Sequence, residues 1–108
     1  YWDRYHIPVM VTENGMAARD TVSPDGKVHD PERVNFLRQF LPGMKRAVEE
    51  GIPVLGYQHW SVMDNFEWCE GYGPRFGLIY VDYQTQKRTL KDSAYEYAKI
   101  IQTNGETL

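Results

Sequence analysis

The sequence lacks several features that would point to a particular class of protein. Its single cysteine, Cys69, excludes an internal disulfide framework. No apolar run approaches the ~20 residues that a transmembrane helix requires, so no membrane partner is expected. Lys and Arg total 12 against 15 for Asp and Glu, and they form no basic stripe, which argues against a nucleic-acid partner. Nothing in the sequence indicates a cofactor or a metal site.

The chain also lacks an initiator Met, and its 108 residues are too few for a complete (β/α)8 barrel, which needs roughly 250 residues. Residues 1–6 read like the last turn of a helix that is already under way, so we expect the C-terminal piece of something longer. With 42% hydrophobic and 25% charged residues, the composition is typical of a globular chain and not of a disordered one.

Aromatic residues, in contrast, are abundant. They make up 14% of the chain, and many of them lie between Tyr57 and Tyr83, in a stretch that is also rich in glycine. Aromatic side chains on loops, rather than along helix faces, indicate a surface on which a ligand stacks. The sequence therefore favours a binding site in this segment.

The hydrophobic pattern predicts an α/β fold. Short apolar runs at residues 7–12 and 53–60 indicate two strands. Between them, Pro31 stands at the first position of a helix whose apolar residues repeat on one face until Gly51. Alternation of strand and helix implies parallel pairing of the strands. Two parallel strands alone leave open edges, so we expect further strands from elsewhere.

Two local signals refine the predicted helices. Pro42 cannot donate a hydrogen bond to the carbonyl of Arg38, so we expect a kink or a break in the middle of the first helix. Residues 89–92 resemble a capping box, which predicts that the second helix follows it and runs to about Thr103.

Polar and aromatic residues follow both predicted strands. Glu13 ends the first strand, and α/β folds place their sites at the carboxyl ends of parallel strands. A loop carboxylate bonded to nearby amides is the alternative. The segment from Trp60 to Trp68 follows the second strand and should face the same side. An indole stacks on the apolar face of a pyranose and a carboxylate such as Glu67 accepts from two hydroxyls, so this segment suits a sugar; core aromatics with a solvated Glu are the alternative.

Taken together, these segments closely resemble the end of the family 1 glycoside hydrolases, the β-glucosidase family. The resemblance covers nearly the whole chain and rests on motifs in the correct order: Thr12-Glu13-Asn14-Gly15, His59-Trp60-Ser61, Asp64-Asn65-Phe66-Glu67-Trp68, Gly71-Tyr72, Arg75-Phe76-Gly77-Leu78 and Val81-Asp82-Tyr83. The resemblance implies an α/β protein of the (β/α)8 TIM barrel type. Residues 1–108 would be the C-terminal quarter of that single barrel, with its seventh and eighth strand–helix units.

By the same resemblance, Glu13 matches the catalytic nucleophile of a retaining β-glycosidase. It would attack the anomeric carbon of a β-D-glycoside and form a covalent glycosyl-enzyme, which water hydrolyses with retention of configuration. Retaining chemistry needs a second carboxyl group ~5–5.5 Å away as acid and base. The family's Asn-Glu-Pro motif for that residue is absent here. The remaining N-terminal portion of the barrel is therefore an expected partner, and the isolated chain is expected to be inactive.

The resemblance also assigns residues to the sugar. Trp60 matches the stacking platform, Glu67 the residue that holds the 4- and 6-hydroxyls, Trp68 a donor to the 3-hydroxyl and Phe76 an aromatic lining. The peptide bond between Trp60 and Ser61 is expected to be cis. Because a carboxylate repels a phosphate, Glu67 favours a neutral, unphosphorylated glycon.

Other interpretations stay open at this stage. Trp60, Trp68 and Phe76 also suit a carbohydrate-binding fragment without catalysis. A family member specialised for thioglycosides or for transglycosylation would carry the same motifs, because some thioglucosidases lack the acid Glu on a strand outside this chain.

Several neighbouring residues receive structural interpretations. Asp64, Asn65 and Arg75 are expected to brace the loop after the second strand by hydrogen bonds. Asp30 and Arg33 are expected to fix the start of the first helix rather than to touch substrate.

Overall fold

The computed structural model describes residues 1–108, and its elements alternate as predicted. In chain order they are helix α1 (Trp2–Tyr5), strand β1 (Val9–Asn14), helix α2 (Pro31–Glu49), strand β2 (Val54–His59), the 3-10 helix η1 (Trp68–Glu70), strands β3 (Ile79–Val81) and β4 (Arg88–Leu90), and helix α3 (Asp92–Gln102). β1 and β2 pair in parallel, as predicted, whereas β3 and β4 form an antiparallel hairpin. None of the helices combines the length and the apolar character needed to cross a membrane.

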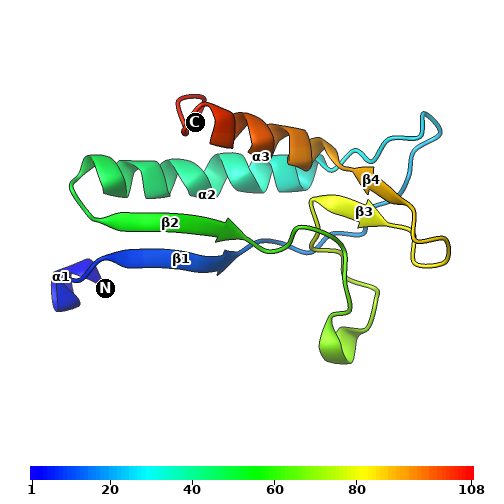
Figure 1. Cartoon of the computed structure of the whole chain (residues 1–108), viewed down its shortest axis with the longest axis horizontal. Helices are drawn as coiled ribbons and strands as arrows, with labels where there is room; N and C mark the ends of the chain where they lie inside the picture. The colour runs from blue at the N-terminus through cyan, green and yellow to red at the C-terminus, as the bar shows by residue number, and fades with distance from the viewer.

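The chain forms two layers. Helices α2 and α3 lie side by side over one face of the β1–β2 pair, and the hairpin lies beyond the carboxyl ends of these strands (Figure 1). Leu37 and Leu41 of α2 and Ile100 of α3 form the buried core, against which Tyr57 of β2 packs. The opposite face of the sheet has no helix (Figure 1).

Irregular pairing sets which side chains reach the open face. Val11 pairs with Tyr57 and Asn14 with His59, so three steps along β1 match two along β2. The extra residue is a bulge in β1. As a result both residues just before Asn14 are exposed, and one of them is Glu13.

The predicted break in α2 and the predicted capping box are both wrong. α2 continues through Pro42 without a break. Leu37 and Leu41, which precede Pro42, are buried, and Met44 after it packs against them, so this packing offsets the hydrogen bond that Pro42 cannot make. The capping box is also absent: Thr89 lies in β4, and the N-cap of α3 is Lys91, whose side chain makes no capping bond. Pairing of β4 with β3 takes these residues out of the helix.

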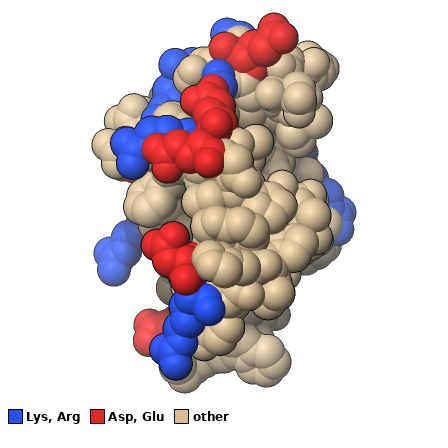
Figure 2. All heavy atoms as spheres, turned by 90° about the vertical axis from the view of Figure 1, so that its left-hand side faces the viewer, with Lys and Arg blue, Asp and Glu red and all other residues tan.

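The molecule is a thin slab. It measures 47 × 32 × 18 Å and its radius of gyration is 15.6 Å, whereas a compact chain of this length has about 13 Å. Seen from the end at which β1 begins, charged side chains form a broken band, and a broad uncharged area lies beside it (Figure 2). Only 14 of the 108 residues are buried, which is few for an independent domain.

Candidate active site

The carboxyl ends of β1 and β2 bring two predicted site residues to the same edge of the sheet. Glu13 is exposed and is the second-last residue of β1, and Trp60, which is 39% exposed, directly follows β2. The backbone N–H of Trp60 donates to the carbonyl of Asn14 at 2.9 Å. This bond fixes the start of the second loop against the residue that follows Glu13.

Side-chain contacts on the other face show which way these residues point. The Tyr57 hydroxyl donates to Oδ1 of Asn14 at 2.9 Å, and the rings of Tyr57 and His59 lie against Tyr97 of α3. Asn14, Tyr57 and His59 therefore face the helices. Because neighbouring residues of a strand point to opposite faces, Glu13 and Trp60 are directed to the face that no helix covers.

Burial perturbs two groups in the layer behind this edge. It raises the pKa of Tyr57 to about 12. It lowers the pKa of His59 to about 4, and the positive charges of Arg33 and Lys91 lower it further. The Nε2 atom of His59 is buried and has no hydrogen-bond partner. His59 is thus a neutral packing residue at neutral pH, in agreement with its placement toward α3.

A close backbone contact joins the two loops at the site edge. A Cβ atom on Gly15 would lie 1.8 Å from the carbonyl oxygen of Trp60, so only glycine fits there. The peptide bond between Trp60 and Ser61 is cis, as predicted. The N–H of Ser61 then donates to the carbonyl of Phe76 at 3.1 Å, which brings this predicted site residue next to the turn.

Asp64 braces the loop after β2, as predicted. Its carboxylate accepts from the guanidinium of Arg75 at 2.6 Å, from the N–H of Gly77 at 3.0 Å and from the N–H of Val81 at 3.3 Å. Asn65 adds a bond from its amide to Oγ of Ser61 at 3.2 Å. The loop is therefore held by buried hydrogen bonds within the chain.

A buried ionic cluster extends this bracing to the helices. Arg33 is fully buried and pairs with Asp30 and with Asp20, the latter at 2.9 Å, which agrees with its predicted role at the start of α2. Lys91, also fully buried, pairs with Asp20 and Asp64. Sequence reasoning missed Asp20 and Lys91, because they are 71 residues apart and no local motif links them.

The remaining two predicted residues lie on the far part of the loop. Glu67 is half-buried just before η1, and its N–H donates to the carbonyl of Gly71 at 2.7 Å. Trp68 has a positive φ of 46° and is 79% exposed, and its indole forms a T-shaped pair with the ring of Phe66. Nothing in this chain covers the Trp68 indole, so any site that uses it needs a further wall.

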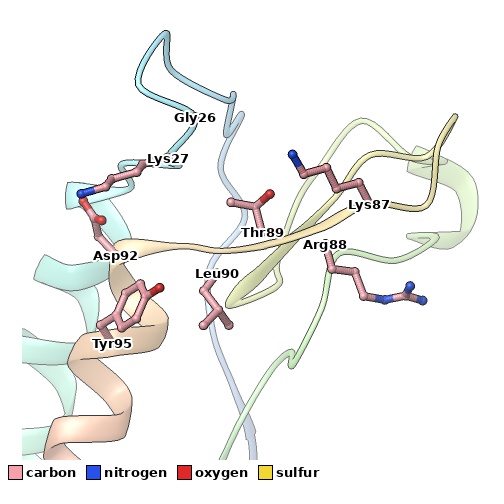
Figure 3. A pocket seen from close by; sticks show the side chains of 8 residues that line it. All are labelled: Gly26, Lys27, Lys87, Arg88, Thr89, Leu90, Asp92 and Tyr95. Atoms are coloured by element: carbon pink, nitrogen blue, oxygen red, sulfur yellow. The ribbon is translucent and has the colours of Figure 1, made fainter.

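The four main pockets of the chain lie elsewhere. Figure 3 shows one of about 510 Å³, between the turn at Gly26, strand β4 and the start of α3. Neither this pocket nor three others of 420 to 580 Å³ contains Glu13, Trp60, Glu67, Trp68 or Phe76. No group of three or more His, Cys, Asp or Glu side chains is arranged to hold a metal ion.

Comparison with known proteins gives consistent matches. A model of glycosyl hydrolase family 1 matches residues 2–106. A 1,4-β-D-glucan glucohydrolase of Thermotoga neapolitana is 54% identical over 92% of this chain and 22% of its own length. An aryl-phospho-β-D-glucosidase of Bacillus subtilis is 43% identical over 100% of this chain and 24% of its own. The family 1 β-glucosidase structure of Thermotoga maritima superposes with a TM-score of 0.94 at 48% identity, over 96% of this chain and 24% of that one.

The chain thus spans about a quarter of the length of the relatives it matches. Its α/β fold agrees with part of the family 1 β-glucosidase structure. Since the family model covers almost every residue, the resemblance seen in the sequence is confirmed: the chain belongs to glycosyl hydrolase family 1.

Proposed function

We propose that this chain supplies the nucleophile and the glycon-binding side of a retaining β-D-glycosidase. It acts within the completed barrel, by which we mean this chain together with the remaining portion of its family 1 enzyme. In that barrel, residues 1–108 form the C-terminal quarter, with the seventh and eighth strand–helix units. The position of Glu13 beside Trp60, at the carboxyl edge of a parallel strand pair and on its open face, is the observation that carries the proposal.

The proposed reaction has two steps. The carboxylate of Glu13 attacks the anomeric carbon of a β-D-glycoside while the bond to the leaving-group oxygen breaks and that oxygen takes a proton. The proton comes from a carboxylic acid in the remaining portion of the barrel. The resulting carboxylate then accepts a proton from water, whose oxygen attacks the anomeric carbon as its bond to Glu13 breaks. The sugar leaves with its original configuration and Glu13 is again a free carboxylate.

The proposed glycon is a neutral sugar such as glucose, galactose or fucose. Trp60 stacks beneath the ring, Glu67 accepts from the 4- and 6-hydroxyls, Trp68 donates to the 3-hydroxyl and Phe76 lines the same pocket. The B. subtilis relative is named for a phosphorylated substrate, so the choice between a neutral and a phosphorylated glycon needs a direct test. Because two negative groups repel each other, we expect 4-nitrophenyl β-D-glucoside to be hydrolysed faster than its 6-phosphate.

Covalent labelling tests the role of Glu13. A 2-deoxy-2-fluoro-β-glucoside should inactivate the completed barrel, and peptide mass spectrometry should find the sugar on the peptide that contains Glu13. Glu13→Gln should lower kcat by at least about 10³-fold, since it removes the nucleophile. Glu70→Gln, which changes an exposed carboxylate nearby, should leave kcat unchanged. A label on another carboxylate, or an active Glu13→Gln variant, overturns the proposal.

The alternatives predict different results in the same assay. A carbohydrate-binding fragment would bind glucose as the isolated chain and would add no Glu13-dependent turnover to the remaining portion of the barrel. A thioglycosidase would form the same covalent label on Glu13 but would hydrolyse thioglucosides faster than the matching O-glucosides.

A further inference from the structure

Lys91 occupies an unusual position for a lysine. It is fully buried directly before α3, and its ammonium nitrogen Nζ lies 2.6 Å from Oδ2 of Asp20 and 2.8 Å from Oδ1 of Asp64. Lysines are almost never fully buried unless they are paired, because removing an ammonium group from water is costly. The two carboxylates therefore explain how the charge is tolerated, but not why a charge stands there.

The two carboxylates belong to the two loops of the candidate site. Asp20 lies on the loop that follows β1 and hence Glu13, whereas Asp64 lies on the loop between Trp60 and Glu67. Each carboxylate also has another cation: Arg33 binds Asp20, and Arg75 binds Asp64. Lys91 is the side chain that pairs with both.

Backbone contacts link the same two loops farther from the site. Ala18 and Arg75 form an antiparallel bridge, with N···O distances of 3.0 and 3.1 Å, and Arg33 donates to the carbonyl of Arg75 at 2.8 Å. This bridge holds the loops together without Lys91. Asp64, however, is only three residues from Glu67, the residue proposed to hold the glycon hydroxyls, and Lys91 is the group that ties this carboxylate to the loop that follows Glu13.

We propose that Lys91 is a positioning residue for the glycon end of the site. Its ammonium group fixes Asp64 against Asp20 and thereby sets where the loop presents Glu67 relative to Glu13. The proposal rests on the proposed function. A lysine suits this task because its compact charge can bind two carboxylates from different directions. A buried ion pair is weak evidence for stability alone, so a role in geometry accounts better for its presence.

A substrate comparison separates positioning from folding. In the completed barrel, Lys91→Met keeps the apolar stem of the side chain and removes the charge, while Arg33 and Arg75 still pair with the two carboxylates. We measure kcat and KM with 4-nitrophenyl β-D-glucoside and with its 6-deoxy analogue, which lacks one hydroxyl that Glu67 is proposed to bind. A hydrogen bond to a charged group is worth about tenfold to a hundredfold in rate. We therefore expect kcat/KM to fall about tenfold or more for the glucoside and less than about threefold for the analogue.

Ser93→Ala is the matched control. Ser93 is fully buried two residues from Lys91 and bonds to Asp30 through its N–H and hydroxyl, but it does not contact Asp64. The Ser93→Ala variant should have a lower melting temperature, and its kcat/KM should change by the same factor for both substrates. If Lys91→Met does not fold, Asp20→Asn replaces it. Weakening the ion pair between Asp20 and Lys91 should lower kcat/KM more for the glucoside than for the 6-deoxy analogue.

The outcomes distinguish the two proposals. If the unaltered completed barrel hydrolyses the glucoside in a Glu13-dependent way, but Lys91→Met or Asp20→Asn reduces kcat/KM equally for both substrates or not at all, the positioning role of Lys91 is wrong and the proposed function stands. If the unaltered barrel shows no Glu13-dependent hydrolysis, both proposals fail together.

Discussion

At the scale of single residues, one glycine controls how closely the two site loops approach. A methyl group on Gly15 would lie 1.8 Å from the Trp60 carbonyl oxygen. We expect Gly15→Ala to destabilise the completed barrel by about 1–3 kcal/mol, as overpacking does, and to lower kcat/KM because the loop that carries Trp60 must move. Gly43→Ala in α2, where no atom lies within 4 Å, should be neutral or stabilising by up to about 1 kcal/mol. Urea unfolding and kinetics of both variants check this; equal effects at the two positions would contradict it.

Another residue, His59, should make stability depend on pH. The folded state holds its pKa at about 4, whereas an unfolded histidine has about 6.5. The unfolded state therefore binds the proton more readily. The contribution of neutral His59 to the free energy of unfolding is complete above about pH 6.5 and is lost as pH falls from there toward 4. We expect His59 to lower the free energy of unfolding by about 1–2 kcal/mol over this range. Each unit of pKa difference is worth about 1.4 kcal/mol, and residual solvent screens part of the effect.

The measurement for His59 is a difference between variants, because carboxylates also titrate in acid. Urea unfolding of the completed barrel at pH 7 and pH 4.5 should show a smaller loss of stability for His59→Phe than for the unaltered protein. His6→Phe, at an exposed position, is the control and should leave the loss unchanged. A His59→Phe variant with the full acid sensitivity would contradict the prediction.

Residues also show where sequence reasoning stops at the site. Glu13 and Trp60 could be placed at one edge from the sequence, because each follows a predicted strand and parallel strands share their carboxyl ends. Asp20 and Lys91 could not, because their pairing spans 71 residues and depends on the folded path of two loops. The bracing role of Asp64 was predicted, but its lysine partner was not.

At the scale of elements, local signals failed where tertiary contacts outweighed them. Pro42 favours a break, yet α2 is continuous: Leu37 and Leu41 before the proline are buried in a core with Ile100 of α3, and Met44 after it packs against the same core. The sequence of residues 89–92 favours a helix start, yet pairing with β3 makes part of it a strand. The two strands and two long helices were predictable, since their hydrophobic patterns extend over many residues and agree with their packing.

The helix layer should respond strongly to changes in its core. Leu37 of α2 is fully buried in a core with Ile100 of α3. Leu37→Ala should therefore lower the free energy of unfolding by about 2–5 kcal/mol through lost burial and a cavity. Arg46→Ala is the control, because its ion pair with Glu50 joins side chains that are 79% and 60% exposed, and it should change stability by no more than about 0.5 kcal/mol. Urea unfolding of the completed barrel measures both; a Leu37→Ala cost as small as that of the control would show that this core contributes little.

At the scale of the whole molecule, the open face of the sheet decides how the chain behaves alone. Ile7, just before β1, Met10 in β1 and Leu55 in β2 are large apolar residues that are 59%, 46% and 71% exposed. Only a two-stranded sheet lies there, and its outer edges carry unpaired backbone groups. A radius of gyration above that of a compact chain agrees with a slab that needs a second body against it.

The isolated chain should therefore self-associate and lack glycosidase activity, because its apolar face and strand edges are open and the acid carboxylate is missing. Adding the remaining N-terminal portion of the barrel should bury that face and produce turnover. The rate should rise linearly with the amount of that portion added and level off at a 1:1 molar ratio. Sedimentation velocity and hydrolysis of 4-nitrophenyl β-D-glucoside, followed through the titration, measure both effects. Glu13→Gln should give the same assembly without turnover, which separates docking from chemistry. A monomeric isolated chain that hydrolyses the glucoside would show instead that these 108 residues contain a complete site.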